Sequence, residues 1–405
     1  MKKRVIVIGG GAAGMMAAGT AAKQGHSVAL IEQNKLLGKK LMITGKGRCN
    51  ITNAAESVAD LLKNVITNSR FLYSAFYSFD NFQTIDFFES AGVQTKVERG
   101  NRVFPVSDKS IDVVNALRNF LIENNVEIIN DTVLNIETQN NIISGVTCKK
   151  RGFLHADSVI LATGGVSYPA TGSTGDGFKW AENLGHTITP LTPSLVPVTV
   201  AEEWISSVQG LSLKNVAITV KNNKTIYTDF GEMMFAHFGL TGPIILSASA
   251  HMKNAENVKI FLDLKPALSE KQLDERLLRD FSENMNKDFI NSLNKLLPKA
   301  LIPALVELSG IDPHQKVNSI SSKARKEFVS LLKNIEFNVT GFAPIEQAII
   351  TSGGISVKEI NPSTMESKKI PGLFFAGEII DVDALTGGFN LQIAFSTGYL
   401  AGLCC

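Results

Sequence analysis

Residues 5–32 read VIVIGGGAAGMMAAGTAAKQGHSVALIE, and this stretch decides the fold of the N-terminal part of the chain. A short apolar run leads into Gly9-x-Gly11-x-x-Gly14, small residues at helical spacing follow, and a second apolar run ends at Glu32. The three glycines permit a sharp turn out of a strand, close approach of the backbone to a pyrophosphate, and close packing of a helix on a sheet. Glu32 stands where a carboxylate accepts hydrogen bonds from ribose hydroxyls. The stretch predicts a dinucleotide site, although S-adenosylmethionine enzymes share part of the pattern.

The composition is that of an ordinary globular protein. The chain has 405 residues, of which 44% are hydrophobic and 19% charged, and a formal net charge of +2. The net charge therefore gives the chain as a whole no strong electrostatic attraction to nucleic acid or to an anionic membrane. Four scattered cysteines do not make a disulfide framework, no apolar run is long enough to cross a membrane, and glycines cut the first run too short for a secretion signal. We expect a cytoplasmic protein with no membrane association and no obligate protein partner.

Strand and helix patterns alternate at both ends of the chain, which predicts an α/β fold with a parallel sheet. The pattern changes after a proline cluster at 190–197, first to short strands and then, from Ser269, to helices with leucines at helical spacing. We predict a discontinuous nucleotide-binding domain at residues 1–190 and 341–405. A β-rich insert on the substrate side, at 191–268, and a helical insert at 269–340 interrupt it.

Three further glycine-rich segments favour FAD as the dinucleotide. They are GKKLMITGKGRCNITN at 38–53, VILATGGVSYPATGSTGDG at 159–177, and GLFFAGEIIDVDALTGGFN at 372–390. The second predicts a strand that returns to the sheet beside the dinucleotide. The third predicts a strand, an acidic loop and a glycine pair that opens the final helix, whose positive end suits the negative charge of a reduced flavin at N1 and O2.

These segments supply the expected contacts of a non-covalently bound FAD. Asp381 is expected at the ribityl or ribose hydroxyls, and Arg48 and Asn50 offer donors to the flavin ring. A carboxylate at Glu32 disfavours a 2′-phosphate, so FAD or NAD is preferred to NADP there. The complete predicted set is Gly9, Gly11, Ala13, Gly14, Glu32, Lys40, Arg48, Cys49, Asn50, Thr163, Gly164, Gly377, Asp381, Gly388, Phe389 and Asn390.

In these blocks, and in FAHFGLTGP at 235–243, the chain resembles the BaiN/RdsA family of bacterial FAD-dependent oxidoreductases. The resemblance follows family order over the whole chain. It implies a Rossmann-like FAD-binding domain of the glutathione-reductase type, with an inserted β-barrel-like domain and a small helical domain. It also implies reduction of an activated C=C bond, in a steroid or bile-acid enone or in a uracil base of 23S ribosomal RNA. Some members are described as aminoacetone oxidases.

No second Gly-x-Gly-x-x-Gly is present, so an NAD(P)H donor would visit the flavin transiently rather than occupy a domain of its own. We consider three candidate catalytic residues. His237 is suited to general-acid chemistry or to carbonyl polarisation, with packing in the insert as the alternative. Tyr168 follows the Ala-Thr-Gly-Gly segment and is equally interpretable as a packing residue. Arg48 would hold substrate or the flavin pyrimidine, with a local ion pair as the alternative.

Three other classes of site are weighed. Cys49 has no partner cysteine nearby, which favours a buried thiol over a redox group. Six histidines without ligand spacing predict no metal site. The third is an RNA-binding surface on the helical insert. The alternative interpretation is an ordinary solvated helix face, and the nearly balanced charge of the insert weakens the RNA-binding interpretation. The basic residues of this surface would be Lys316, Lys323, Arg325, Lys326 and Lys333. The competing functions are an oxidase of a small amine and a flavin-containing RNA-binding or regulatory protein with little turnover.

Overall fold

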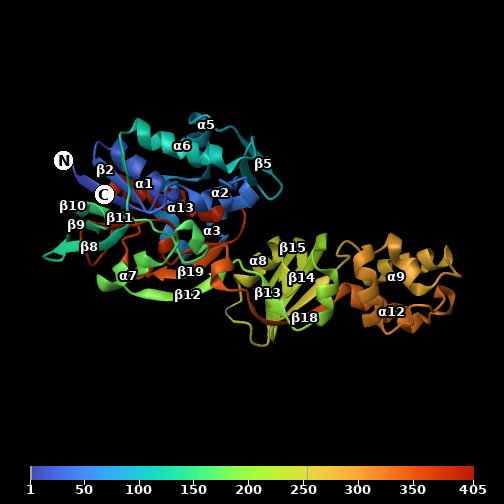
Figure 1. Cartoon of the computed structure of the whole chain (residues 1–405). Coiled ribbons are helices and arrows are strands. Elements are labelled where there is room, and N and C mark those ends of the chain that lie inside the picture. Colours follow the sequence, from blue (N-terminus) through green and yellow to red (C-terminus); the bar gives the residue numbers. More distant parts are fainter. Residues whose placement is uncertain (1, 253) are drawn as a thin grey trace. The chain divides into compact units, whose positions relative to one another are not determined.

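The computed structural model describes residues 2–252 and 254–405. The chain forms two compact units, one comprising residues up to 194 together with 344–405, and the other comprising 195–343. Both ends of the chain, blue and red in Figure 1, belong to the first unit. The predicted α/β class, with a Rossmann-like domain, a barrel and helices, is confirmed.

A five-stranded sheet forms the centre of the first unit. All its pairings are parallel, and the strand order is β20 (Leu373–Phe375), β11 (Ser158–Leu161), β1 (Arg4–Ile8), β2 (Ser27–Glu32) and β7 (Glu127–Asn130). Val5–Ile8 and Ser158–Leu161 are buried throughout, because elements cover both faces of a parallel sheet and leave no polar side. The carboxyl ends of these strands lie along one edge, and that edge carries the candidate site.

Two helices rich in small residues bring the start and the end of the chain together. Helix α1 (Ala12–Lys23) packs against α13 (Phe389–Cys404), and Figure 1 shows the two in the same layer. A Cβ at Gly398 would overlap the carbonyl of Ala13, and one at Gly402 would overlap that of Ala17. Only glycine therefore allows this backbone contact, which places the last strand–loop–helix beside the first glycine-rich turn.

The other elements of the first unit surround this core. The additional sheets are β3 (Thr52–Asn53) with β6 (Arg102–Pro105) and β5 (Thr95–Glu98), β8 (Val133–Gln139) with β9 (Ile142–Cys148) and β10 (Gly152–His155), β12 (Ile188–Ser194) with β19 (Ile350–Ile355), and β4 (Val65–Thr67) with β21 (Asp383–Ala384). The additional helices are α2 (Lys39–Ile43), α3 (Val58–Leu62), α4 (Tyr73–Ser78), α5 (Asn81–Ser90), α6 (Ser110–Glu123) and α7 (Asp176–Asn183).

The second unit is a closed barrel with helices. The barrel order is β13 (Val198–Val200), β16 (Gly239–Thr241), β15 (Lys224–Ala236), β14 (Ser212–Asn222), β17 (Lys259–Asp263) and β18 (Ile335–Phe342). Its helices are α8 (Pro243–Ser249), α9 (Glu270–Ser282), α10 (Phe289–Ser292), α11 (Ile302–Ser309) and α12 (Ser322–Lys333).

Strand β18 differs from the sequence-based expectation, which left most of its residues in the helical insert. Ile335, Phe337 and Val339 are buried and alternate with exposed neighbours, which is the period of a half-buried strand. The chain thus leaves the barrel after β17, forms the helices, and returns to complete the barrel. In the part of the chain that the structure describes, no helix has the length and apolarity needed to span a membrane.

Candidate functional site

The carboxyl edge of the central sheet gathers the glycine-rich segments that the sequence places far apart. The ends of β1 and β2 lead to Gly9 and Glu32, and those of β11 and β20 lead to Thr163 and Gly377. In open parallel sheets, ligands bind in the crevice outside this edge. The predicted cofactor residues on these four strands therefore share one neighbourhood.

The turn after β1 has a backbone that only glycine can adopt. Gly9 has a φ of +105°, and a Cβ there would lie 2.5 Å from the carbonyl oxygen of Ala162. A Cβ at Gly14 would overlap the carbonyl of Gly9. At Gly11, the N-cap of α1, a Cβ would meet no atom within 4 Å. The helix therefore begins at open space, with unpaired N–H groups and the positive end of its dipole directed there.

The carboxylate of Glu32 is held in place beside this turn. Its Oε2 accepts from the backbone N–H of Gly10 at 2.7 Å, and its Oε1 accepts from the backbone N–H and the side-chain Nδ2 of Asn34, each at 2.7 Å. An ionised carboxylate has about four acceptor positions, so these three donors leave capacity for a ribose hydroxyl. Sequence reasoning missed Asn34, although its position two residues after the acid is the spacing of an Asx-type local bond.

Thr163, two residues past the end of β11, carries a polar group that the described residues leave unsatisfied. Its Oγ1 is buried and has no hydrogen-bond partner among the described residues. Such an orphan hydroxyl costs about 1–3 kcal/mol. Gly164 follows with a φ of +74°. A ligand that supplied the missing partner would remove the cost, so this atom and the open space at Gly11 both fit a bound dinucleotide.

An ion pair joins four segments at the same edge. Lys40 Nζ lies 2.7 Å from Glu378 Oε2 and donates to Ser167 Oγ at 2.7 Å. Glu378 Oε1 accepts from the backbone N–H of Thr351 at 2.9 Å and from Ser167 Oγ at 3.1 Å. Lys40 was predicted as a cofactor residue. Glu378 was missed, and the available signal was an acid placed directly after Gly377, the glycine that lies two residues past the end of β20.

The segment 49–53 packs against the glycine pair that opens α13. With its amide nitrogen facing the carbonyls of Thr52 and Val103, Asn50 accepts from the N–H of Gly388 at 2.9 Å. Asn53 Nδ2 donates to the carbonyl of Gly387 at 3.1 Å. Gly388 has a φ of +99°, and a Cβ there would overlap the carbonyl of Thr52. Asn50 and Gly388 are thus in direct contact, with Phe389 beside them at the first turn of the helix.

The acidic loop before that helix is fixed by amide and hydroxyl groups. Asn390 accepts from the N–H of Ala384 at 3.0 Å and donates to its carbonyl at 2.7 Å. Burial raises the pKa of Asp381, opposed by hydrogen bonds from Thr189 and Asn68 and reinforced by Asp383. Asn390 therefore holds the loop, and the side chain of Asp381 is bonded to Asn68 Nδ2 at 3.1 Å.

Arg48 takes the arrangement that the sequence left as its alternative. The guanidinium pairs with Glu98 and with Asp108, and it lies 4.2 Å from the centre of the Phe104 ring.

Burial raises the pKa of the neighbouring Cys49 thiol to about 12, so the thiol is protonated at neutral pH. The four cysteines, at 49, 148, 404 and 405, are all free.

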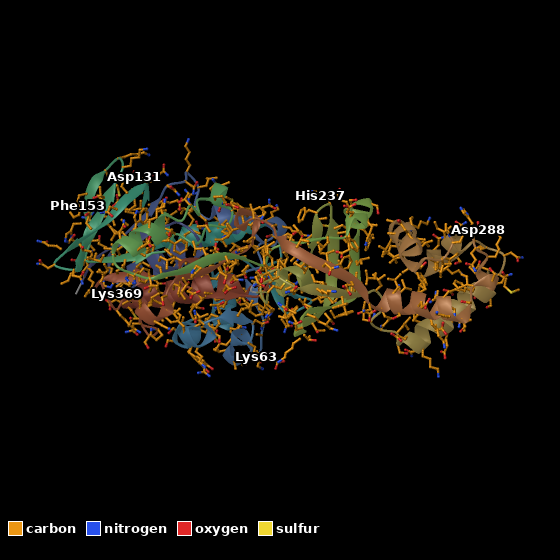
Figure 2. All side chains as sticks on the ribbon, turned by 90° about the horizontal axis from the view of Figure 1, so that it is seen from below. Lys63, Asp131, Phe153, His237, Asp288 and Lys369 are labelled. Carbon is orange, nitrogen blue, oxygen red and sulfur yellow. The ribbon has the colours of Figure 1, made fainter. Side chains whose placement is uncertain are left out.

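The two other catalytic candidates belong to different units, Tyr168 to the first, directly after Ser167 of the ion-pair network, and His237 to the second. Tyr168 is 37% exposed, has a φ of +51°, and donates its backbone N–H to the carbonyl of Glu346 at 3.0 Å. His237 belongs to the second unit, where it is exposed in the turn between β15 and β16 and packs edge-on against Phe238 (Figure 2).

Most of the predicted RNA-binding side chains in the helical insert are paired. Lys316 lies 2.7 Å from Asp288, which Figure 2 labels among the helices. The other pairs are Arg325 with Asp274, Lys333 with Asp263, and Lys323 with Glu327. Within residues 2–252 and 254–405, no group of three or more His, Cys, Asp or Glu side chains could hold a metal.

A Rossmann-type sheet with a glycine turn, an acid at the end of its second strand and a final helix at its carboxyl edge is the architecture of a class, the FAD-dependent oxidoreductases. Comparison with known proteins supports this class and gives the family. The profile of the HI0933-like protein Rossmann domain matches residues 3–404, and the chain belongs to this family. The predicted membership of the BaiN/RdsA family and the predicted enzyme class are thereby confirmed.

Two curated relatives match over nearly their whole lengths. The chain is 30% identical over 406 residues to a 3-dehydro-bile acid delta(4,6)-reductase of Clostridium scindens, covering 98% of each chain. It is 31% identical over 408 residues to a ribosomal RNA dihydrouridine synthase of Haemophilus influenzae, covering 98% of this chain and 97% of the relative. Among solved structures, a 3-ketosteroid delta1-dehydrogenase from Sterolibacterium denitrificans has a TM-score of 0.55 at 14% identity, over 99% of this chain and 98% of the other, and shows the fold alone.

Proposed function

We propose that the chain binds FAD at the carboxyl edge of the central sheet and uses it to reduce a C=C bond conjugated to a carbonyl. The observation that carries the proposal is the convergence of four glycine-rich segments on one edge, with an orphan buried hydroxyl at Thr163 and open space at Gly11. Bound FAD supplies hydride transfer to the β-carbon of such a substrate. The remaining tasks belong to the side chains and backbone of this chain.

Binding and orientation fall to groups at the two ends of the edge. The N–H groups at the start of α1 suit the pyrophosphate, and Glu32 suits the ribose. At the other end, the amides of Phe389 and Asn390 open α13 and carry the positive end of its dipole. Lys40 adds a positive charge that Glu378 holds in one position. Asp381 is assigned to the ribityl or ribose hydroxyls.

The relatives favour this reaction class because both are named for related chemistry. One reduces 3-dehydro-bile acids at positions 4 and 6, where the double bonds are conjugated to the 3-keto group. The other makes dihydrouridine in ribosomal RNA, which saturates the double bond conjugated to the uracil carbonyl. A polarised alkene is the feature common to both. We assign this chain a substrate of that kind, either a steroid-type enone or a uracil base of ribosomal RNA.

Protonation of the α-carbon requires an acid of this chain. We assign His237 to this role, because an imidazole donates a proton near neutral pH, and keep Tyr168 as the second candidate.

We further propose NADH or NADPH as the electron donor. Free thiols at all four cysteines agree with a reducing, cytoplasmic location.

Anaerobic titration tests the proposal. We expect the purified yellow protein to be bleached by NADH or NADPH and to recover its colour slowly when air is admitted. Rapid recovery with stoichiometric peroxide, together with reduction by aminoacetone, would instead identify an amine oxidase. If no nicotinamide donor and no amine bleaches the flavin, both enzymatic assignments are wrong and a regulatory or RNA-binding role with little turnover replaces them.

A further inference from the structure

A surface turn at residues 169–174, which we call the strap, lies along the segment that follows Glu32. Three consecutive carbonyls of the strap each accept a hydrogen bond from a side chain of residues 33–39. The pairs are Gln33 Nε2 with Gly172 at 3.1 Å, Asn34 Nδ2 with Thr171 at 3.1 Å, and Lys39 Nζ with Ala170 at 2.9 Å. The strap and residues 33–39 therefore run in opposite directions, side by side, and these three bonds join them through side chains.

Hydrogen bonds within the strap and at its first end make it a compact turn. Thr171 donates its backbone N–H at 2.9 Å and its hydroxyl at 2.7 Å to the carbonyl of Tyr168, and Gly172 donates its N–H to the carbonyl of Pro169 at 3.0 Å. The residues that flank the strap both have left-handed backbones, with a φ of +51° at Tyr168 and +81° at Gly175. A compact turn between two such positions can move as one body while its flanking residues absorb the change in backbone angle.

The strap has few of the contacts that fix a segment in place. Of the described residues 169–174, none belongs to the hydrophobic core of the first unit, and Ser173 alone among them is buried. Segments with few buried apolar contacts open locally at a low free-energy cost. The bonds from residues 33–39 are therefore the contacts that decide whether the strap stays closed.

The closed position depends on a close approach of backbone to side chain. Gly172 has a φ of +111°, and a Cβ there would lie 2.5 Å from Asn34 Nδ2. Any residue larger than glycine would push the strap away from Asn34. The strap is thus shaped to lie directly against the residue that also holds the carboxylate of Glu32.

Lys39 and Asn34 connect the strap to Glu32. Lys39 Nζ donates to Asn34 Oδ1 at 3.1 Å in addition to its bond to the strap. Because an ammonium group only donates, this bond orients the amide of Asn34 with Nδ2 toward acceptors. Asn34 Nδ2 then donates both to the carbonyl of Thr171 and to Glu32 Oε1, the latter at 2.7 Å. One amide therefore bonds the strap and the carboxylate assigned to the ribose.

We propose that the strap is a lid that closes over the adenosine end of bound FAD, with Lys39 and Asn34 as the latch that holds it closed. This inference rests on the proposed function and concerns how the cofactor is retained at that site. The closed strap must release its bonds to residues 33–39 before the adenosine end can leave. The latch therefore governs the rate of FAD release more than the rate of FAD association.

The first test is the rate at which the FAD-loaded protein releases FAD after dilution, followed by the rise in flavin fluorescence. Lys39→Met should speed release roughly tenfold, the scale of one lost hydrogen bond to a charged group, and should not slow association. Lys39→Arg keeps a charged donor and should restore slow release. The matched control is Lys35→Met, which removes the same charge from an exposed position of the same segment and should release FAD at the wild-type rate.

A second variant acts from the side of the strap. Gly172→Ala should also speed FAD release, because its Cβ would displace the strap from Asn34. The matched control is Gly185→Ala, where φ is likewise positive, at +85°, and a Cβ would meet no atom within 4 Å. It carries the same kind of backbone strain away from the strap and should leave the release rate unchanged.

Amide hydrogen exchange of a peptide that covers residues 169–174 gives a readout independent of turnover. In the wild-type protein we expect saturating FAD to slow exchange in the strap. In Lys39→Met, at the same saturation, we expect the strap to exchange nearly as fast as in the apoprotein. A strap that is a fixed part of the fold would instead exchange at one rate with and without FAD.

Wild-type release rates in both Lys39→Met and Gly172→Ala would overturn the inference, as would exchange in the strap that FAD does not change. Equally fast release by either control variant would assign the effect to lost charge or to backbone strain and would overturn it too. Circular dichroism of each variant identifies misfolding, and the two variants act on different residues of the same contact. A wild-type protein that binds no FAD would remove the proposed function as well, whereas FAD binding with unaltered release by the variants would remove this inference alone.

Discussion

The carboxyl edge of the first unit and the exposed turn of the second unit that bears His237 differ in how strongly the backbone determines each residue. At the edge, Gly9, Gly14 and Gly388 occupy positions where a Cβ would meet a carbonyl, so no other residue fits. At His237 the side chain is exposed and packs edge-on against its neighbour Phe238. The backbone conformation thus requires these glycines at the edge. No packing constraint of that kind requires a histidine at position 237, so only a role in the reaction would require one there. The predictions below test that difference.

The largest effect is expected at Gly11. Because a Cβ there meets no protein atom within 4 Å, Gly11→Val should fold normally yet fill the space assigned to the pyrophosphate. We expect a colourless, folded protein, measured by flavin absorbance and circular dichroism after purification. Gly14→Val is the matched comparison, because its side chain overlaps the carbonyl of Gly9 and should disrupt the turn itself. Full flavin content in Gly11→Val would show that the cofactor lies elsewhere.

The second effect concerns the barrel unit. His237→Ala should keep the flavin and its reduction by the donor, and lose roughly 100-fold in single-turnover oxidation by substrate, which is the low end of general-acid catalysis. Stopped-flow absorbance of the reduced enzyme mixed with substrate measures this rate. An unchanged rate would return the proton-donor role to Tyr168.

The third effect tests the ion pair at the edge. Glu378→Gln removes the charge that holds Lys40, and both side chains are largely buried, at 15% and 23% exposed. We expect FAD binding to weaken by about 1–2 kcal/mol, a value reduced from that of a fully buried pair because water screens the remaining exposure. Isothermal titration of the apoprotein with FAD measures it, and Lys40→Met combined with Glu378→Gln isolates the coupling. Lys259→Met at an exposed barrel pair is the control.

The smallest effect is a loss of stability in acid. Burial lowers the pKa of His186, opposed by Glu359, so the unfolded state binds the proton first and stability falls below pH 6.5. For Glu359, burial raises the pKa, but Lys369 and Thr187 outweigh it and set the pKa to about 2, below the ordinary value of 4.5. Its contribution is present above pH 4.5 and is lost toward pH 2. Urea unfolding midpoints measured across this pH range follow both losses of stability, the one below pH 6.5 and the one between pH 4.5 and pH 2. His186→Asn should remove the loss below pH 6.5. If that loss is unchanged in the variant, His186 is not its cause.

Sequence reasoning succeeded where conformational demands are local. The turn at Gly9, the position of Glu32 at the end of β2 and the glycine pair before α13 have fixed spacing, and the strand–helix order around them follows from hydrophobic period. Strand β18 shows the same period but was missed because helical patterning directly precedes it. The pairing of Lys40 with Glu378 could not be predicted, because 338 residues separate them and only the completed sheet brings them together. The ion pairs of Arg48 likewise depend on the β5–β6 hairpin, whose register the sequence leaves undetermined.

The central claim is most directly tested by single-turnover reoxidation. The enzyme, reduced anaerobically, would be mixed separately with a steroid enone, with uridine-containing ribosomal RNA, and with oxygenated buffer, while flavin absorbance is followed and products are analysed by mass spectrometry. The account predicts that one carbonyl-conjugated alkene reoxidises the flavin faster than oxygen does and gains two hydrogen atoms. Fast reoxidation by oxygen with peroxide, and no reaction with either alkene, would contradict it.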